Sequence, residues 1–307
     1  MKILVVGAGA IGGYFGGRML QAGGDITFLV RSRRARELAR DGLVIKSPHG
    51  DLTIPNPPTV EAVGLKEKFD VVLLSCKAFD LEDAMSSFAP AVGDHTMIVP
   101  LLNGMKHLDV LDAKFGSQRV VGGQCAIAAT LNAERHVVQL APMQALTFGE
   151  RDGSMSERVN AFGKIVEAGH FSGATSHNIL QEMWEKWVFL ATLAGVTSAM
   201  RGPVGHIIAA PGGRDFVLGV RDECASVAAA ADHALRDENR TRVEGMLTTE
   251  GSPMTASMYR DIQANAAIEA DHIIGDMIAR ADIAKAPVPR LRMIYTHLKV
   301  YEAQRAK

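Results

Sequence analysis

A glycine motif directly after the first apolar run restricts the fold of this chain more than any other feature. Residues 3–6 are apolar, Gly7-Ala8-Gly9-Ala10-Ile11-Gly12 follows at once, and a helical pattern continues to residue 22. Glycines at these positions allow a tight turn and let backbone N–H groups approach a pyrophosphate at the N-terminus of the next helix. The motif therefore predicts the first βαβ unit of a dinucleotide-binding domain. A glycine-rich turn without a ligand is the alternative.

The rest of the first half alternates short apolar runs with helical segments, which is the pattern of an α/β domain. The apolar runs lie at residues 3–6, 26–30, 43–46, 71–75 and 97–101. Several are continuous, as in strands buried on both faces of a parallel sheet. Longer extended stretches at 122–130 and 136–149 flank a polar turn at 132–135. Pro100 lacks a ladder donor and favours a strand end at Val99.

The second half has a different pattern, because its apolar residues recur every three or four positions. This predicts helices at 179–200, 214–236, 257–285 and 290–306, some of them broken, with prolines between them. A length of 307 residues fits two domains. We therefore predict an α/β fold class, with a Rossmann-type dinucleotide-binding domain at 1–174 and an all-helical C-terminal domain for substrate binding and dimerisation at 175–307. We expect the active site in the cleft between them.

Composition excludes several other classes of protein. Lys and Arg number 33 against 34 Asp and Glu, so charge gives no case for nucleic-acid binding. The three cysteines are far apart and the histidines lack ligand spacing, which argues against disulfides and against a metal site. No signal-peptide pattern or bilayer-length apolar stretch occurs. We expect a cytoplasmic protein with no membrane partner.

The end of the second predicted strand indicates which dinucleotide binds. An NAD site usually places an acidic residue there to bind the ribose hydroxyls, but this strand ends at Arg31, followed by Arg33 and Arg34. A guanidinium cannot accept a hydrogen bond from a hydroxyl, whereas it pairs well with a 2′-phosphate. NADPH is therefore favoured over NADH. The alternative, that the arginines only solvate the next helix, applies more to Arg34 and Arg36 than to Arg31.

Two polar residues follow later strands of the predicted sheet. Lys77 comes after the run at 71–75, and Asn103 comes after the run at 97–101. Ligands of open α/β sheets bind outside the carboxyl ends of the strands, where the glycine motif and Arg31 are also expected. Taken singly, each of the two residues could be an ordinary loop residue. Their shared placement predicts one rim that binds the cofactor.

Lys186 stands out in the helical half because it borders an apolar helical stripe. Leu190 and Ala194 lie one and two turns further along its own face. Such a lysine either extends to solvent, which is the commoner outcome, or lies in a partly dry cleft. In a cleft its ammonium would lose solvation and become a better proton donor. The residues alone leave both alternatives open.

Taken together, these residues resemble the ketopantoate reductase (2-dehydropantoate 2-reductase) family over nearly the whole chain. The matching segments are the motif Gly7–Gly12, Arg31, Ser75-Cys76-Lys77-Ala78, Leu102-Asn103-Gly104-Met105, Trp184-Glu185-Lys186, and Ser257-Met258-Tyr259-Arg260-Asp261-Ile262 with Glu269 downstream. Members of the family reduce 2-oxopantoate to pantoate with NADPH, a step of pantothenate and coenzyme A biosynthesis. The order and spacing of the set are far more specific than the glycine motif alone.

The resemblance implies roles for particular residues on the cofactor side. Arg31 would bind the 2′-phosphate, in agreement with the argument from charge. Lys77 and Asn103 would line the cofactor, with Asn103 near both the nicotinamide and the substrate. Ala129 would make a backbone contact to the cofactor. Glu269 would reach the nicotinamide ribose.

The resemblance also implies how the substrate is held. Lys186 would be the general acid that protonates the carbonyl oxygen as hydride reaches the carbon, which suits an ammonium beside a developing alkoxide. Ser257 would hold the substrate carboxylate, and Glu269 would also bind the substrate hydroxyl. Together these roles describe the reduction of a small 2-oxo acid.

Three positions depart from the family pattern. Well-known members carry substrate-contacting asparagines where this chain has Leu190 and Ala194, and a third is replaced around Val204. A site without polar partners leaves a substrate hydroxyl unpaired, which weakens its recognition. The leading prediction is therefore NADPH-dependent reduction of ketopantoate, with a more apolar 2-oxo acid or ketone as the alternative substrate. A non-catalytic NADPH sensor is a third alternative, and the exposed helical half is compatible with a homodimer.

Overall fold

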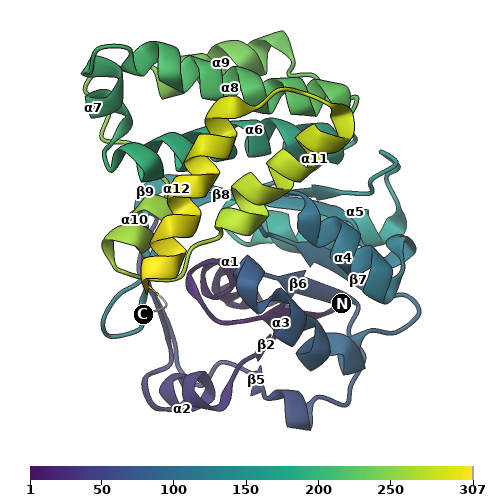
Figure 1. Cartoon of the computed structure of the whole chain (residues 1–307). Helices are drawn as coiled ribbons and strands as arrows, with labels where there is room; N and C mark the ends of the chain where they lie inside the picture. Colours follow the sequence, from purple (N-terminus) through teal and green to yellow (C-terminus); the bar gives the residue numbers. More distant parts are fainter. Residues whose placement is uncertain (306–307) are drawn as a thin grey trace. The chain divides into compact units, whose positions relative to one another are not determined.

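Five parallel strands form the first sheet of the N-terminal half (Figure 1). The sheet has the order β5-β2-β1-β6-β7, with β5 at Thr59–Val60, β2 at Asp25–Leu29, β1 at Lys2–Val6, β6 at Val71–Leu74 and β7 at Met97–Pro100. The central strands β1 and β6 are buried at almost every position, as their continuous apolar runs predict. The glycine motif therefore follows the central strand β1, which has β2 on one side and β6 on the other.

A second sheet contains the remaining strands of this half. It has the order β10-β9-β3-β4, and β8 pairs with β9. Its strands are β3 (Leu43–Lys46), β4 (Leu52–Ile54), β8 (Gly122–Leu131), β9 (Val137–Gly149) and β10 (Ser172–Thr175). The predicted strands at 43–46, 122–130 and 136–149 are confirmed. The short β4, β5 and β10 were missed because two to four residues carry too little periodicity.

The predicted strand end at Val99 is wrong, since β7 continues through Pro100. β7 is the edge strand of its sheet, and Pro100 pairs with Leu74 on the inner side. The missing N–H of a proline is tolerated at an edge because no further strand needs it. The backbone N–H of Leu101 then donates to the carbonyl oxygen of Leu74 at 2.8 Å, so the pairing continues past the proline.

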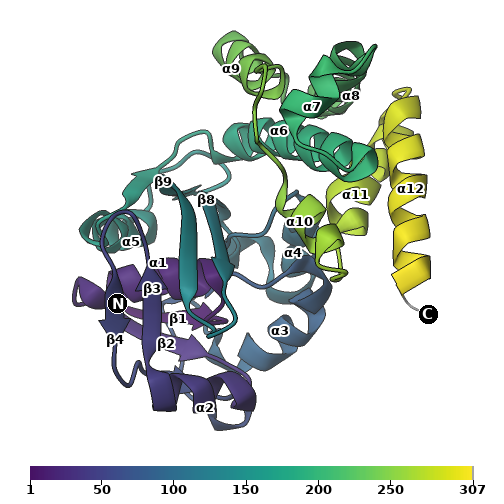
Figure 2. The same ribbon diagram turned by 90° about the vertical axis from the view of Figure 1, so that its left-hand side faces the viewer.

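The helix α1 (Ala10–Gln21) packs closely against both sheets, and its glycines make this contact feasible. A Cβ on Gly16 would lie 2.7 Å from the ring of Phe28 in the first sheet. A Cβ on Gly17 would lie 2.8 Å from Ile45 in the second sheet. Figure 2 shows α1 beside strands of both sheets. The glycines that follow the motif therefore serve packing, in addition to the turn itself.

The structure is a computed structural model that describes residues 1–305, and it divides into two compact units. The first unit contains residues 1–102 and 107–179, and the second contains residues 103–106 and the chain from 180 onward. The first unit also carries the helices α2 (Ser32–Asp41), α3 (Leu81–Phe88) and α5 (Glu157–Ala168), and α4 (Lys106–Phe115) follows the segment 103–106. The predicted fold class, a parallel sheet with helices followed by a helical half, is confirmed.

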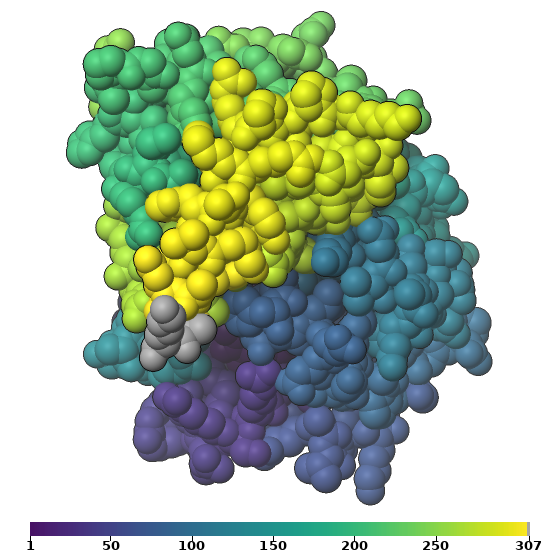
Figure 3. Space-filling view, in the orientation of Figure 1, coloured from purple at the N-terminus to yellow at the C-terminus, as the bar shows by residue number. Residues whose placement is uncertain are grey.

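The described part of the second unit is helical. Its elements are α6 (Ile179–Met200), α7 (Val204–Ala209), α8 (Gly213–Ala230), α9 (Asp237–Leu247), α10 (Ser257–Gln263), a π-helix at Asp271–Gly275, α11 (Asp276–Ala284) and α12 (Pro289–Arg305). The predicted helix at 179–200 is confirmed, whereas the one at 214–236 ends at Ala230, before Asp232 with its φ of 63°. The helix α12 covers part of the surface of this unit (Figure 3). Within residues 1–305, no helix is long and apolar enough to cross a bilayer.

Candidate active site

The glycine motif forms a tight turn between β1 and α1, with an open outer side. Gly7 has a φ of 91°, a conformation that side chains with a Cβ rarely adopt. A Cβ on Gly12 would overlap the carbonyl oxygen of Gly7 and Oγ of Ser75, whereas a Cβ on Gly7 or Gly9 would meet nothing within 4 Å. The turn is therefore closed on the side of the sheet and open on the other side.

The open side of this turn fits a dinucleotide pyrophosphate. α1 begins after Gly9 without a side-chain cap, and its first turn carries no acidic residue. Backbone N–H groups and the positive end of the helix dipole therefore point to a region that an anion can occupy. The residues present thus fit the cofactor that the sequence predicts.

Two further predicted cofactor residues follow strands on either side of β1. Arg31 comes after β2 and occupies the N-cap position of α2 without a side-chain cap, and Lys77 comes after β6 and precedes the short 3-10 helix Ala78–Asp80. Since β2, β1 and β6 are adjacent and parallel, these residues and the glycine turn lie at the same edge of the sheet. The structure brings together these three parts of the predicted rim.

Arg31 lies in an acidic environment that the sequence did not indicate. Its Nη2 contacts carboxylate oxygens of Asp80 at 2.8 Å and Asp83 at 2.7 Å. These hydrogen bonds, Asp80 first, raise the pKa of Arg31 above its usual range. The guanidinium is 71% exposed and stays charged, but a 2′-phosphate approaching it would also meet two carboxylates.

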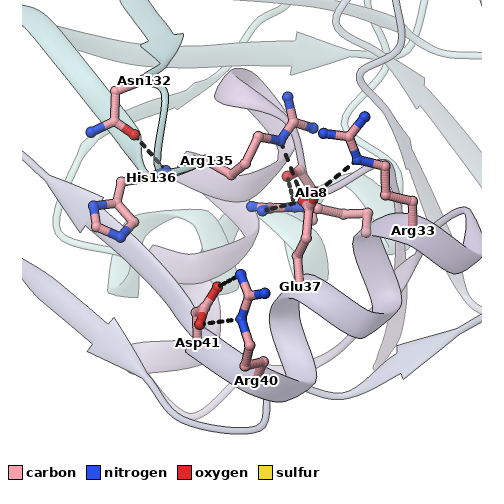
Figure 4. Close-up of polar contacts among 9 residues, drawn as sticks. Ala8, Arg33, Glu37, Arg40, Asp41, Asn132, Arg135 and His136 are labelled. Atoms are coloured by element: carbon pink, nitrogen blue, oxygen red, sulfur yellow. Dashed lines mark hydrogen bonds and ion pairs between the residues drawn. The ribbon is translucent and has the colours of Figure 1, made fainter.

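A second basic group lies beside the glycine turn, and one of its members, Arg135, was not found from the sequence. Arg33, Arg34 and Arg135 all contact the carboxylate of Glu37, at 2.9, 3.2 and 3.3 Å (Figure 4). Arg135 comes from the β8–β9 turn, far along the chain, so no local sequence pattern could reveal it. Burial alone would raise the pKa of Glu37, but the three arginines lower it overall. Three cations on one carboxylate leave a net positive charge.

Arg34 connects this basic group to the cofactor turn. Its Nε donates a hydrogen bond to the carbonyl oxygen of Ala8 at 3.1 Å. The side chain is only 11% exposed, and Nη2 is buried with no hydrogen-bond partner within residues 1–305. Burial lowers the pKa of Arg34, with Glu37 acting in the opposite direction. The prediction that Arg34 merely solvates the helix α2 is therefore wrong, because the residue is buried against the glycine turn.

Ala129 lies on the strand β8, after an irregularity in the pairing with β9. The register shifts between Ile127 and Ala129, and Ala129 then pairs with Gln139. Gln139 in turn accepts a hydrogen bond from the hydroxyl of Tyr14 on α1, at 2.9 Å. This pairing links the strand of Ala129 to the helix that begins at the glycine turn. The backbone contact of Ala129 to the cofactor stays a prediction.

Asn103 belongs to the second unit, although it follows β7 in the chain. The next residue, Gly104, has a φ of 79°, and a Cβ there would lie 3.1 Å from the carbonyl oxygen of His272 and 3.3 Å from its ring. Glycine is therefore needed both for the turn and for the close approach to residue 272. The predicted rim thus divides, with Asn103 placed among helical residues of the second unit.

The helix α6 presents Lys186, Leu190 and Ala194 on one face, four residues apart. Lys186 and Leu190 are half-buried, and Ala194 is fully buried. The structure therefore favours the partly dry environment for Lys186 over full exposure to solvent. Val204, at the start of α7, is also fully buried and donates its N–H to the carbonyl of Met254 at 3.0 Å.

Ser257 and Glu269 lie in later segments of the second unit, at the start of α10 and just before the π-helix Asp271–Gly275. Ser257 begins α10, and the preceding N–H of Ala256 donates to Oγ1 of Thr197 on α6 at 3.4 Å. Glu269 is 7% exposed, and its carbonyl accepts a hydrogen bond from the N–H of Ile273. The six predicted residues of the substrate side, Asn103 included, thus come from four segments of one unit.

Glu185, next to Lys186, has a structural role that explains part of the Trp184-Glu185-Lys186 segment. Its carboxylate accepts hydrogen bonds from Nε, Nη2 and the backbone N–H of Arg236, which precedes α9. The side chain is 3% exposed. Burial alone would raise the pKa of Glu185, but the bonds from Arg236 and Gln181 lower it overall. Glu185 therefore fixes the start of α9 against α6.

Replacing Glu185 by glutamine is expected to lower the free energy of unfolding by about 1–3 kcal/mol, because charged hydrogen bonds in a buried position are lost. The folded-state pKa of Glu185 lies below its ordinary value of 4.5, so its stabilisation is complete above that pH and is lost as the pH falls below it. Chemical denaturation at pH 7 and pH 4 checks this. A difference between wild type and variant that grows in acid would contradict it.

The glycine turn of the first unit fits a dinucleotide, and the second unit by itself carries the amine, hydroxyl and carboxylate side chains of Lys186, Ser257 and Glu269. Within residues 1–305, no cluster of three or more His, Cys, Asp or Glu side chains could hold a metal ion. The residues described above supply backbone N–H groups that can bind an anion and side chains that can exchange protons.

Comparisons with known proteins cover nearly the whole chain. The family model described as ketopantoate reductase PanE/ApbA matches residues 3–153, and the model of the C-terminal domain of PanE/ApbA matches residues 178–302. The uncharacterized oxidoreductase YkpB of Bacillus subtilis is 34% identical over 310 residues, which cover 99% of this chain and 100% of the relative. A 2-dehydropantoate 2-reductase of Nostoc is 23% identical, with 99% and 96% covered.

Solved structures share the fold over the same length. The 2-dehydropantoate 2-reductase of Geobacter metallireducens superposes with a TM-score of 0.88 at 25% identity, covering 97% of this chain and 99% of that chain. D-mandelate dehydrogenase, solved as a ternary structure with NADH and anilino(oxo)acetate, gives a TM-score of 0.88 at 19% identity, with both chains covered completely. At that identity the second likeness concerns the fold alone.

Proposed function

The chain belongs to the ketopantoate reductase family, and from this premise we propose that it reduces the ketone of 2-dehydropantoate to pantoate with NADPH. The resemblance found in the sequence is confirmed, and the chain is an oxidoreductase that uses a nicotinamide dinucleotide. The substrate, the pantothenate and coenzyme A pathway, the cytoplasmic location and the homodimer are predictions. The half-buried Lys186 on α6 is the observation that carries the proposed reaction.

Each step of the proposed reaction has a residue of suitable chemistry. The bound dinucleotide supplies the hydride. Lys186 donates a proton from Nζ to the carbonyl oxygen as negative charge develops there, and its partly dry surroundings strengthen that interaction. Ser257 donates its hydroxyl hydrogen to the substrate carboxylate, and Glu269 accepts a hydrogen bond from a substrate hydroxyl. Glu269 is buried, so a substrate without the hydroxyl would leave its carboxylate without that hydrogen bond at a cost in binding free energy. The interaction therefore selects for substrates that carry the hydroxyl.

The proposal is tested by the oxidation of NADPH in the presence of ketopantoate and a panel of apolar 2-oxo acids. Preferred turnover of ketopantoate supports the proposal. Turnover restricted to the apolar acids supports the second candidate, a reductase of a more apolar 2-oxo acid. The apolar Leu190 and Ala194 on the face of Lys186 favour that candidate. Binding of NADPH without turnover of any 2-oxo acid would overturn both.

Replacing Leu190 by asparagine tests the role of the apolar face. If the missing amide limits recognition of the substrate hydroxyl, the variant should raise kcat/KM for ketopantoate about 5- to 20-fold, the value of one hydrogen bond. Leu190→Ala is the matched control, since it shortens the side chain without adding a polar group. Ala194 is a poorer position for the same change, because it is 1% exposed and an asparagine would overfill its surroundings. An equal gain in both Leu190 variants would contradict the interpretation.

We also propose that Arg31 sets the preference for NADPH. Arg31→Ala should weaken NADPH binding by about 1–3 kcal/mol and leave NADH nearly unchanged, because one charge-assisted pair with the 2′-phosphate is lost. Titration of each cofactor measures this. Arg40→Ala is the matched control, since Arg40 is an exposed arginine paired with Asp41. Equal losses for NADPH and NADH would refute the role of Arg31 and direct attention to Arg34 and Arg135.

A further inference from the structure

We propose that the π-helix Asp271–Gly275 positions Asn103 relative to Lys186 and Glu269, and that His272 is the positioning residue for Asn103. This inference rests on the proposed function, since it concerns residues of that site. All the contacts that carry it lie within the second unit. They connect three segments that are far apart in the sequence.

The first contact joins the π-helix to the segment of Asn103. His272 forms a hydrogen bond with the backbone of Asn103, and this bond raises the pKa of the imidazole, so the backbone group is the accepting carbonyl. The His272 ring also lies against Gly104, within 3.3 Å of where a Cβ would be. Burial is the largest influence and lowers the pKa of His272, which favours the neutral form of the ring. A neutral imidazole has a single N–H donor.

The second contact joins the π-helix to the helix of Lys186. The indole N–H of Trp187 donates to the carbonyl oxygen of Ile273 at 3.0 Å, and both groups are buried. Trp187 is the residue directly after Lys186, so its anchoring restricts the backbone that carries the lysine. In the same turn, the N–H of Ile273 donates to the carbonyl of Glu269 at 2.9 Å. Ile273 therefore connects the segment of Lys186 to that of Glu269.

The third contact holds the π-helix on its outer side. Asp271 accepts hydrogen bonds from the hydroxyl of Tyr295 at 2.6 Å and from Nζ of Lys299 at 2.9 Å, both on α12. Burial alone would raise the pKa of Asp271, but these bonds lower it overall. The turn is thus held by neighbours on several sides, although π-helical geometry is itself unfavourable. Single π-turns occur frequently at functional sites.

These contacts make His272 a positioning residue with a specific consequence. Asn103 is predicted to lie near the nicotinamide, whereas the adenosine end of the cofactor is predicted to bind around Arg31 in the first unit. Loss of the His272 hydrogen bond should therefore affect only ligands that contain the nicotinamide. A general loss of structure would affect both kinds of ligand.

The test compares His272→Phe and His272→Gln in the full chain. The phenylalanine keeps a ring but removes the donor, and the glutamine keeps an N–H donor. We expect His272→Phe to weaken NADPH binding and to lower kcat about 5- to 10-fold, the value of one hydrogen bond, with little change in KM for the 2-oxo acid. We expect His272→Gln to recover most of both losses. Binding of 2′,5′-ADP, which lacks the nicotinamide, should stay within about twofold of wild type.

Several outcomes would overturn the inference. Equal weakening of NADPH and of 2′,5′-ADP would indicate a structural role only, as would equal losses in the phenylalanine and glutamine variants. His206→Phe is the matched control, because His206 is exposed on α7 and should change neither ligand. Trp187→Phe is the second variant, and it should lower kcat if the contact with Ile273 positions Lys186. The binding measurements need no turnover, so an enzyme inactive on every 2-oxo acid would refute the proposed function while still testing His272.

Discussion

Replacing Lys186 by methionine should lower kcat for 2-oxo acid reduction by about 10²–10⁴-fold, the usual contribution of a general acid. Methionine keeps most of the length and apolar character of the side chain, so the half-buried position on α6 should still pack well. NADPH binding should change little, because the predicted cofactor contacts lie elsewhere. Steady-state kinetics with the best 2-oxo acid measures the effect. A lower kcat with unchanged NADPH affinity indicates the loss of the proton donor, whereas a loss of both indicates a damaged structure.

A second variant and a control sharpen the test of Lys186. Lys186→Ala leaves a space that a small primary amine can enter, so added methylamine should restore part of the rate if the ammonium is the proton donor. Lys164→Met is the control, since Lys164 is an exposed lysine on α5. A near-normal rate in Lys186→Met would remove Lys186 from the mechanism. A similar rate increase when methylamine is added to the Lys164→Met variant would point to a non-specific effect of the amine.

The sequence predicted those parts of the fold that local patterns determine. The strands before and after the glycine turn have continuous apolar runs, and α6 has a sustained helical period, so their positions were predicted to within a residue or two. The division of the strands into two sheets could not be predicted in the same way. β3 has the same kind of apolar run as β2, and only its pairing with the distant β9 places it in the second sheet.

The candidate site shows the same division between local and distant signals. Arg31 was found because it follows a strand, but its pairing with Asp80 and Asp83 depends on the connection after β6, which lies on the other side of β1. The sequence favours a solvent-facing Arg34, but the structure buries this residue beside Glu37, which also binds Arg135 from the distant β8–β9 turn. Residues of this kind are identified only by tertiary contacts.

Asn103 shows most clearly that a residue next to a strand in the sequence can pack with a distant part of the chain. Its position after the strand run at 97–101 predicted a place on the cofactor-binding rim, yet the residue groups with the helical unit. The signal that could have indicated this is Gly104, since a glycine after Asn103 suggests a positive φ or a close approach to another segment. The partner in that approach, His272, could not be inferred from spacing.

Replacing Gly12 by alanine should weaken binding of NADPH and NADH alike by roughly 30- to 1000-fold, or about 2–4 kcal/mol. The new Cβ would overlap the carbonyl oxygen of Gly7 and Oγ of Ser75, so α1 must move away from β1. That movement displaces the N–H groups that are placed to bind the pyrophosphate, which both cofactors share. Because Ser75 Oγ also donates to the carbonyl of Val6 at 3.0 Å, the end of the central strands is disturbed as well.

The appropriate control is Gly245→Ala on α9, because a Cβ there would meet nothing within 4 Å. That change should leave cofactor binding unchanged and stabilise the chain by about 0.5–1 kcal/mol, since alanine is the better helix former. Fluorescence titration with NADPH and NADH, alongside thermal unfolding of both variants, measures each effect. Unchanged affinity in Gly12→Ala would mean that the turn does not carry the pyrophosphate. Weakening of NADPH alone would place the damage at the 2′-phosphate, because a pyrophosphate contact cannot distinguish the two cofactors.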